Sequence, residues 1–334
     1  MGSGYSIGGV VFGQLFKARS FTSAYKGPTI PDHVDLTGKV FLVTGASSGL
    51  GKMLVIELTK RGADVHLISR TMDKLQKVKA EAETQAKAEG KKSGNLSCHS
   101  LDMSDMSAVC KFVADFPKDK AIHCLVNNAG ALPYEREMVS GGRLEKTTAC
   151  HVVGPYLLIK GLHAQLKLGN GRVINNASAG LYGAQMDVAA LKDGFKTYVK
   201  KDNKVDGALV YAVCKRAMLE MSDFLADCYS EDGTVIMTNH PGWCETEGLK
   251  PLLDQHAGYG SITFRDPRDG MMGMYYLCVA PEVDTSYSGK FYFDGKAVEK
   301  HQMFTSTSSS DRSVNEMIAF CEKFNKLPAG SDGN

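Results

Sequence analysis

A tyrosine and a lysine four positions apart are the residues whose chemistry stands out most in this sequence. Tyr211 and Lys215 lie in a segment with a helical pattern, so both side chains project from one face, one turn apart. An ammonium group beside a phenol favours the phenolate and lowers the phenol pKa from about 10. We therefore expect Tyr211 to exchange a proton with a substrate oxygen near neutral pH.

Ser178 is the third residue with candidate chemistry. It follows a predicted strand over residues 172–176, where its hydroxyl can hydrogen-bond a carbonyl oxygen as negative charge develops there. Taken alone, a Tyr-x-x-x-Lys pair is usually a surface feature of a helix. The interpretation as a reactive pair depends on the elements that position it.

Those elements follow an alternating pattern. From Lys39 onward, short runs of β-branched residues alternate with helix-length segments, as in successive βαβ units. We predict seven strands, at residues 40–44, 64–69, 95–101, 122–126, 172–176, 234–238 and 290–293. Helices are expected to begin near Leu50, Met72, Ser104, Leu144, Ala208 and Asp269, with a final helix over about 314–324. This order predicts an α/β fold, a single Rossmann-type doubly wound domain with a mainly parallel seven-stranded sheet. We assign residues 35–304 to it, between an N-terminal extension (1–34) and a C-terminal tail (305–334).

The first predicted strand runs into a glycine-rich turn and then a helix. Glycine permits a tight turn, close approach of the backbone to a pyrophosphate, and close packing of helix on strand. The N-terminus of the following helix offers N–H groups and a positive dipole to the phosphates. A glycine triplet is a weak signal by itself, but after a first strand it predicts a dinucleotide site. Its residues would be Gly45, Ser47, Ser48, Gly49, Leu50 and Gly51.

The end of the second strand indicates which dinucleotide binds. Enzymes that use NAD usually present a carboxylate there to the ribose 2′-OH. Here the strand ends at Ser69 and is followed by Arg70, whose planar guanidinium can pair with a 2′-phosphate. With Lys52 adding positive charge nearby, this favours NADP(H). The alternative is that Arg70 only stacks on the adenine.

Further strand ends complete the expected cofactor site. After the third strand, Asp102 can accept a hydrogen bond from the adenine amino group. After the fourth, asparagine amides tie strands together and glycine lets the cofactor pass. After the sixth, a Pro-Gly turn would fold over the nicotinamide, with Thr246 placed for the carboxamide, while Lys215 can bond the nicotinamide ribose and Tyr211 lies beside it. The residues of these two later segments are Asn128, Ala129, Gly130, Pro241 and Gly242.

The glycine-rich turn, the Asn-Asn-Ala-Gly segment at 127–130, Ser178 and the Tyr211–Lys215 pair together resemble the short-chain dehydrogenase/reductase superfamily, from about residue 35 to the end. The resemblance implies hydride transfer between NADP(H) and a carbonyl or alcohol, with the serine, tyrosine and lysine in the matching motif positions. We expect a small hydrophobic ketone, aldehyde or alcohol as substrate. Members of the superfamily often form homodimers through the helices that follow the fourth and fifth strands, so the resemblance implies a possible homodimer.

The sequence departs from the family pattern at His151. The family usually has an asparagine there, three residues before a glycine (here Gly154), where it kinks the helix and holds a water in the proton relay. Histidine could bond that water, relay protons with a pKa near neutrality, or simply pack and weaken turnover. Two functions therefore stay open. One is an NADP(H)-dependent oxidoreductase that uses Ser178, Tyr211, Lys215 and His151; the other is a dinucleotide-binding regulatory or scaffold protein with weakened catalysis.

Three segments near the expected pocket are open to two interpretations each. Residues 186–206 lengthen the chain between Ser178 and Tyr211, and could wall the substrate pocket or form a surface excursion. Residues 249–264 are the better candidate for a mobile lid. Cys244, at the root of that segment, could face the pocket or be a buried, inert thiol.

Composition argues against several other classes of protein. Thirty-nine basic and 37 acidic residues give a net charge of +2, without a basic stripe for nucleic acid. Nine cysteines without a Cys-x-x-Cys pair predict neither a disulfide framework nor a metal site. Since no apolar run is long enough to span a membrane, we expect a cytoplasmic protein. Residues 1–6 fit the N-myristoylation pattern, so weak membrane association through the N-terminus is an open alternative to packing on the domain.

Overall fold

The computed structural model describes residues 19–130, 132, 135–200, 203–244, 264–302 and 305–326. Its main element is an eight-stranded sheet in the order β10-β9-β8-β7-β4-β1-β2-β3, and every neighbouring pair is parallel except β9 and β10. The strands are β1 (Val40–Thr44), β2 (Asp64–Ser69), β3 (Leu96–Ser100), β4 (Cys124–Asn127), β7 (Arg172–Asn176), β8 (Val235–His240), β9 (Phe291–Phe293) and β10 (Lys296–Val298). A separate hairpin pairs β5 (Met138–Val139) with β6 (Leu144–Glu145).

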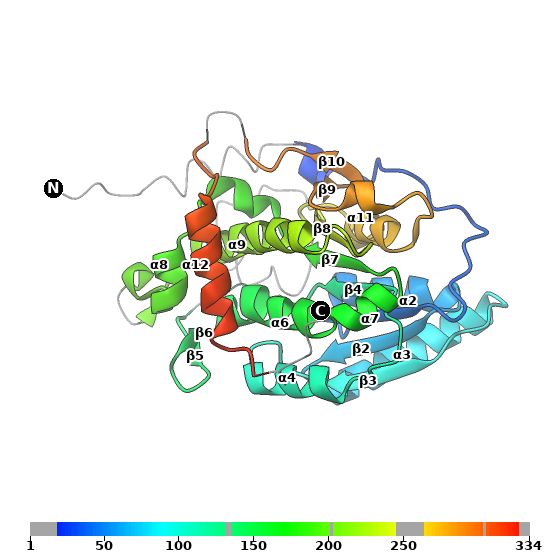
Figure 1. The fold of residues 1–334 in the computed structure, drawn as a ribbon. Helices are drawn as coiled ribbons and strands as arrows, with labels where there is room; N and C mark the ends of the chain where they lie inside the picture. Colours follow the sequence, from blue (N-terminus) through cyan, green and yellow to red (C-terminus); the bar gives the residue numbers. More distant parts are fainter. Residues whose placement is uncertain are drawn as a thin grey trace.

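Helices cover both faces of this sheet (Figure 1). One face is covered by α2 (Gly49–Lys60), α3 (Met72–Ala88) and α11 (Pro267–Val279). The other is covered by α4 (Met106–Asp115), α6 (Gly154–Gly161) and α9 (Gly207–Cys228). The remaining short helices are α5 (Lys146–Thr148), α7 (His163–Leu168) and α8 (Val188–Asp193). The arrangement confirms the predicted doubly wound α/β fold.

All seven predicted strands are present, and the predicted bounds of β1, β2 and β7 match those in the structure. These strands are apolar runs because the sheet is covered on both faces; all five residues of β1 are buried. The eighth strand, β10, is the correction to the predicted count of seven. It is a three-residue strand, mostly exposed, that folds back on β9 through Asp294 and Gly295, both with positive φ. So short and exposed a strand lacks the apolar alternation by which strands are recognised.

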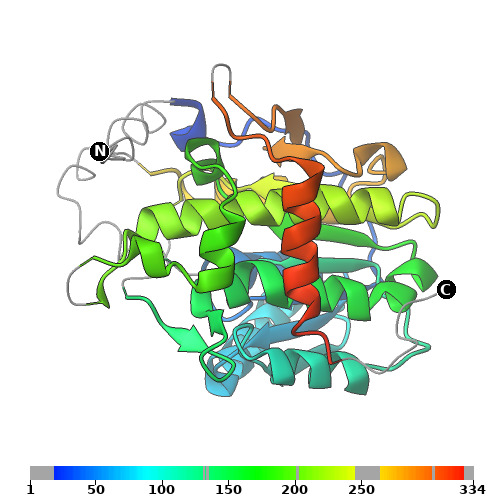
Figure 2. The ribbon, with the colours of Figure 1, turned by 60° about the vertical axis from the view of Figure 1, so that its left-hand side comes forward.

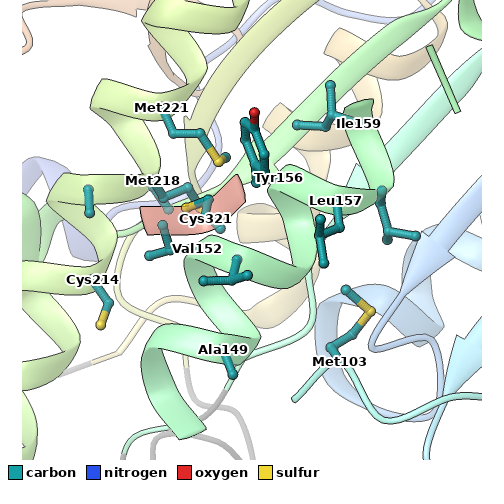
Figure 3. Close-up of a cluster of buried hydrophobic side chains, with 14 of the residues drawn as sticks. Met103, Ala149, Val152, Tyr156, Leu157, Ile159, Cys214, Met218, Met221 and Cys321 are labelled. Carbon is teal, nitrogen blue, oxygen red and sulfur yellow. The ribbon is translucent and has the colours of Figure 1, made fainter. Parts of the chain in front are cut away.

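The C-terminal tail forms the helix α12 (Asp311–Glu322), which lies across α9 and α6 (Figure 2). Its apolar side chains Met317, Phe320 and Cys321 are buried in the same core as the two helices. Figure 3 shows Cys321 among Met218 and Met221 of α9 and Tyr156 of α6. Glu322 accepts hydrogen bonds from Tyr156 and, at 2.7 Å, from Lys160 of α6. Thus α12 covers part of the helices through which the sequence suggested a homodimer.

Two expectations fall outside the part of the chain that the structure describes: the N-myristoylation signal within residues 1–18, and most of the lid expected at 249–264. Among the described residues, none of the helices combines the length and the hydropathy needed to cross a membrane.

Candidate active site

A cavity of about 660 Å³ opens at the carboxyl ends of β1, β2, β4, β7 and β8. Ligands of open parallel sheets bind at this edge, because the loops after the strands converge there. Sixteen residues predicted from the sequence line it together: Gly45, Ser47, Ser48, Gly49, Leu50, Arg70, Asp102, Asn128, Ala129, Gly130, His151, Ser178, Tyr211, Lys215, Pro241 and Gly242. Of the other two, Thr246 lies outside the described residues. Gly51 packs beneath the turn, where a Cβ would lie 2.3 Å from the carbonyl oxygen of Gly45.

The glycine-rich turn presents the start of α2 to the cavity. Gly45 and Gly49 have φ of +65° and +53°, a left-handed backbone conformation that glycine adopts without strain. Ser48 is the N-cap of α2, and its side chain makes no capping bond to the helix in the described structure. The first N–H groups of a helix lack partners within it, so they are available to an anion in the cavity.

A chain of side-chain hydrogen bonds ties the strand ends together behind the cavity. The Thr44 hydroxyl accepts from the backbone N–H groups of Asn128 and Ala129, at 2.9 and 3.0 Å. Asn176 donates to the side-chain oxygen of Asn128 at 3.1 Å, and Asn239 donates to that of Asn176 at 3.1 Å. These bonds cross from β1 to β4, β7 and β8. The sequence indicated the amides after the fourth strand, but gave no signal for Thr44 or Asn239.

Two cations line the cavity near the end of β2. Arg70 is exposed there, as expected, and Lys74 lines the cavity from the first turn of α3. Lys52, which was expected to add charge, instead pairs with Glu81 of α3 at 2.8 Å and does not line the cavity. Lys74 lies four positions after Arg70, at the start of a predicted helix, and that spacing could have identified it. After the neighbouring strand β3, Asp102 accepts two hydrogen bonds from Ser104, at 2.9 and 2.8 Å, which orient its carboxylate.

Tyr211 and Lys215 project from α9 into the same cavity as Ser178. Lys215 Nζ lies 5.4 Å from the centre of the Tyr211 ring and donates to the carbonyl oxygen of Asn176 at 2.7 Å. Burial raises the pKa of Tyr211 to about 12, against the lowering effect of its hydrogen bond with Ser178. The expected lowering of the Tyr211 pKa is therefore wrong for this structure, because the effect of burial exceeds the lowering effect of the Ser178 hydrogen bond. Burial also lowers the pKa of Lys215 to about 8.

His151 lies beside the tyrosine. It belongs to a π-helical turn, Ala149–Val153, that leads into α6, and such turns recur at functional sites. Its ring meets the Tyr211 ring edge to face, with centroids 5.2 Å apart. A Cβ on Gly130 would lie 2.8 Å from His151 Nε2. Full burial, aided by the charge of Lys215, holds the pKa of His151 well below its ordinary value, so a pKa near neutrality is not found.

The insertion before α9 does not line the cavity in its described part, residues 186–200 and 203–206. Instead it supports the cavity wall at 135–137. Arg136 donates to the carbonyl oxygen of Asp193 at 3.1 Å and receives a 2.9 Å bond from Asn203. Cys244 does line the cavity, but its thiol donates to the carbonyl oxygen of Pro241 at 3.3 Å, and burial raises its pKa to about 12. That pKa favours the inert-thiol interpretation.

Comparison with known proteins agrees with the geometry. Residues 39–189 match the model of the short chain dehydrogenase family. Human dehydrogenase/reductase SDR family member 12 is 30% identical over 87% of either chain, and retinol dehydrogenase 13 of Mus musculus is 26% identical over 87% of this chain and 84% of its own. The fold resembles that of L-sorbose reductase from Gluconobacter frateurii, solved with NADPH and L-sorbose, with a TM-score of 0.59 and 21% identity over 81% of this chain and 99% of that one. The chain belongs to the short-chain dehydrogenase/reductase family, whose members are oxidoreductases that bind NAD or NADP.

Proposed function

We propose that this protein is an NADP(H)-dependent oxidoreductase that interconverts a hydrophobic carbonyl compound and its alcohol. The observation that carries the proposal is the meeting of Ser178, Tyr211 and Lys215 with the glycine-rich turn in one cavity. Fold by itself would not support a function, since one fold hosts many. A proton donor that lies beside a dinucleotide-binding turn does support an oxidoreductase function.

The residues present fit a phosphorylated dinucleotide. The uncapped N-terminus of α2 offers N–H groups for the pyrophosphate. At the far end, Arg70 and Lys74 supply two positive charges where a ribose 2′-phosphate would lie. A guanidinium binds phosphate through two parallel hydrogen bonds, and this supports NADP(H) rather than NAD(H).

The chain's own part in the reaction is to handle the proton. NADPH, when bound, would supply the hydride for the carbonyl carbon. Ser178 donates a hydrogen bond to the carbonyl oxygen as its negative charge grows, and Tyr211 gives that oxygen its proton. Lys215, held by the carbonyl oxygen of Asn176, keeps a positive charge beside the ring. His151 is neutral at physiological pH, so its part is to shape the pocket and accept or donate hydrogen bonds, not to titrate.

The substrate end of the cavity supports a hydrophobic substrate. Leu132, Ala208 and Trp243 line the cavity, as do the exposed Glu135 and Glu137. One relative is named for retinol, a hydrophobic alcohol. Such substrates partition into membranes, and the N-myristoylation pattern at residues 1–6 would bring the enzyme to that surface.

The rival function, a dinucleotide-binding regulatory protein with weakened catalysis, is favoured by one observation. With Tyr211 at a pKa of about 12 and His151 in the relay position, the phenolate needed for alcohol oxidation is costly to form. A regulatory protein of this kind would bind the cofactor but would not turn over a carbonyl substrate.

The test is to follow NADPH oxidation by the purified full chain with a panel of hydrophobic ketones and aldehydes, beside Tyr211→Phe. Turnover that Tyr211→Phe abolishes, with NADPH binding retained, is the expected result. Binding of NADPH without turnover of any carbonyl, together with cellular effects that survive Tyr211→Phe, would support the regulatory alternative. Comparable use of NADH would refute the preference for NADP(H).

A further inference from the structure

The chain that precedes the first strand reaches the turn that closes the cavity. The carbonyl oxygen of Phe21, in the short 3-10 helix Arg19–Thr22, accepts a hydrogen bond from the backbone N–H of Trp243 at 2.9 Å. The Phe21 ring lies edge-on to His240 and Phe293, with centroids 4.9 and 5.3 Å away. The Pro241–Cys244 turn lines the cavity on its other side. The N-terminal segment therefore backs the turn from outside the cavity.

A buried ion pair fixes the same turn from a second direction. Arg265, whose side chain is fully buried, pairs with Asp294 at 3.0 Å. The same guanidinium nitrogen of Arg265 donates to the carbonyl oxygen of Pro241 at 3.2 Å, and the backbone N–H of Arg265 donates to the carbonyl oxygen of Trp243 at 2.8 Å. Arg265 also lies over the Phe293 ring, 5.3 Å from its centre. Hence Asp294, in the β9–β10 hairpin, fixes the Arg265 guanidinium, which in turn fixes the Pro241–Cys244 turn.

Asp294 further ties the hairpin to the N-terminal segment. It accepts a hydrogen bond from the backbone N–H of Lys26 at 3.3 Å, and Lys296 donates to the carbonyl oxygen of Lys26 at 2.8 Å. A Cβ on Gly27 would lie 2.0 Å from the carbonyl oxygen of Asp294, so the two backbones are in direct contact. Three distant parts of the sequence thus meet behind one turn.

The turn has little room to move in this arrangement. Gly242 has φ of +79°, and a Cβ there would lie 2.7 Å from both Arg265 and the carbonyl oxygen of Phe21. A buried charge that loses its partner is strongly unfavourable, so Arg265 depends on Asp294. The position of the turn is set by groups that never touch the cavity.

We propose that Phe21, Arg265 and Asp294 are positioning residues, which hold the Pro241–Cys244 turn against the nicotinamide end of the bound cofactor. The N-terminal segment is then part of the cofactor site, although it precedes the dinucleotide-binding domain in the sequence. This inference rests on the proposed function, in that NADP(H) occupies the cavity.

The chain carries its own probe, because Trp243 is the only tryptophan in the sequence. It lies in the turn, 9% exposed, and its emission overlaps the absorption of dihydronicotinamide. Titration with NADPH should quench Trp243 fluorescence by energy transfer, which gives the Kd at the turn itself. The emission maximum of the free protein reports how well the turn is packed.

Asp294→Asn is the cleanest variant. Asparagine tolerates the positive φ of 50° at this position, so the change removes charge and leaves the backbone conformation unstrained. We expect the Kd for NADPH to rise roughly tenfold, because only part of the cost of leaving the buried Arg265 charge without its partner acts on the position of the turn. The emission of Trp243 should shift to the red. Phe21→Ala should shift both quantities in the same direction.

The matched control is Asp223→Asn, which breaks the 2.7 Å pair with Lys300 outside the cavity. It should change neither the Kd nor the emission maximum. If Asp294→Asn and Phe21→Ala bind NADPH as tightly as the wild type with unshifted emission, the positioning role is refuted. A wild type that shows no quenching by NADPH would refute the proposed cofactor site and the inference with it. If Phe21→Ala does not fold, the two Asp→Asn variants decide alone.

Discussion

Lys215 should make the protein less stable at neutral pH than a methionine in its place. Its ammonium is buried, and burial lowers its pKa from 10.5 to about 8. At 1.36 kcal/mol for each pH unit, that difference corresponds to about 3.4 kcal/mol by which folding disfavours the charged form. Lys215→Met removes this cost and keeps an apolar side chain of similar length. It also leaves the Asn176 carbonyl without its 2.7 Å bond, a loss of about 1–2 kcal/mol.

The sign of the pH dependence follows from proton uptake. Between about pH 8 and pH 10.5 the unfolded chain binds a proton at this lysine that the folded protein does not, so wild-type stability rises with pH there. Lys215→Met lacks this gain. Its net advantage of about 1–2 kcal/mol at pH 7 should therefore fall by about 2 kcal/mol by about pH 9.5.

Thermal unfolding at the two pH values measures the effect. With an unfolding entropy of about 2.1 cal/mol/K for each of 334 residues, 2 kcal/mol corresponds to about 3 °C. Lys215→Met should melt above the wild type at pH 7 and lose that advantage at pH 9.5, while carbonyl reduction falls by roughly 100-fold or more. Lys111→Met, on the exposed side of α4, is the control and should show no such pH-dependent difference. A melting difference for Lys215→Met that stays constant with pH would refute the reasoning.

Three other variants probe the site and its surroundings. His151→Asn should leave the pH profile of carbonyl reduction unchanged from about pH 6 to pH 8, because burial keeps His151 neutral; a wild-type inflection near pH 6.5 that the variant lacks would contradict this. Arg70→Ala should raise the Kd for NADPH roughly tenfold and leave that for NADH unchanged; equal losses for both would mean that Arg70 only stacks on adenine. Deleting residues 311–334 should expose the apolar faces of α6 and α9 and increase self-association in size-exclusion chromatography, compared with the chain that keeps these residues; no increase would argue against α12 as their cover.

The sequence predicted best what depends on local pattern. The strand bounds at 40–44, 64–69 and 172–176 are confirmed, because a strand covered on both faces needs an apolar run of its own length. The cavity residues at the ends of these strands followed from the same positions. β10 was missed because its residues at 296–298 are mostly exposed and carry no periodic signal.

What the sequence could not predict depends on burial and on contacts between distant residues. The proximity of Lys215 to Tyr211 was predicted from their spacing, but desolvation, which raises the tyrosine pKa to about 12, depends on everything packed around α9. The lowered pKa of His151 likewise depends on the groups that bury it. The bond between Phe21 and Trp243 joins residues more than 200 positions apart, and neither segment has a motif that points to the other.

Burial shifts the pKa values of Tyr211 and Lys215 in opposite directions, and each shift favours the neutral form. The pair therefore rests as a protonated phenol beside an amine that is charged only below about pH 8. Forming the phenolate at pH 7 from a pKa of about 12 costs about 7 kcal/mol. Giving the proton to a carbonyl oxygen leaves the same phenolate as its product, so reduction meets the same cost after the transfer rather than before it. Turnover in either direction would require the positive charge of Lys215 to stabilise the Tyr211 phenolate against the effect of burial.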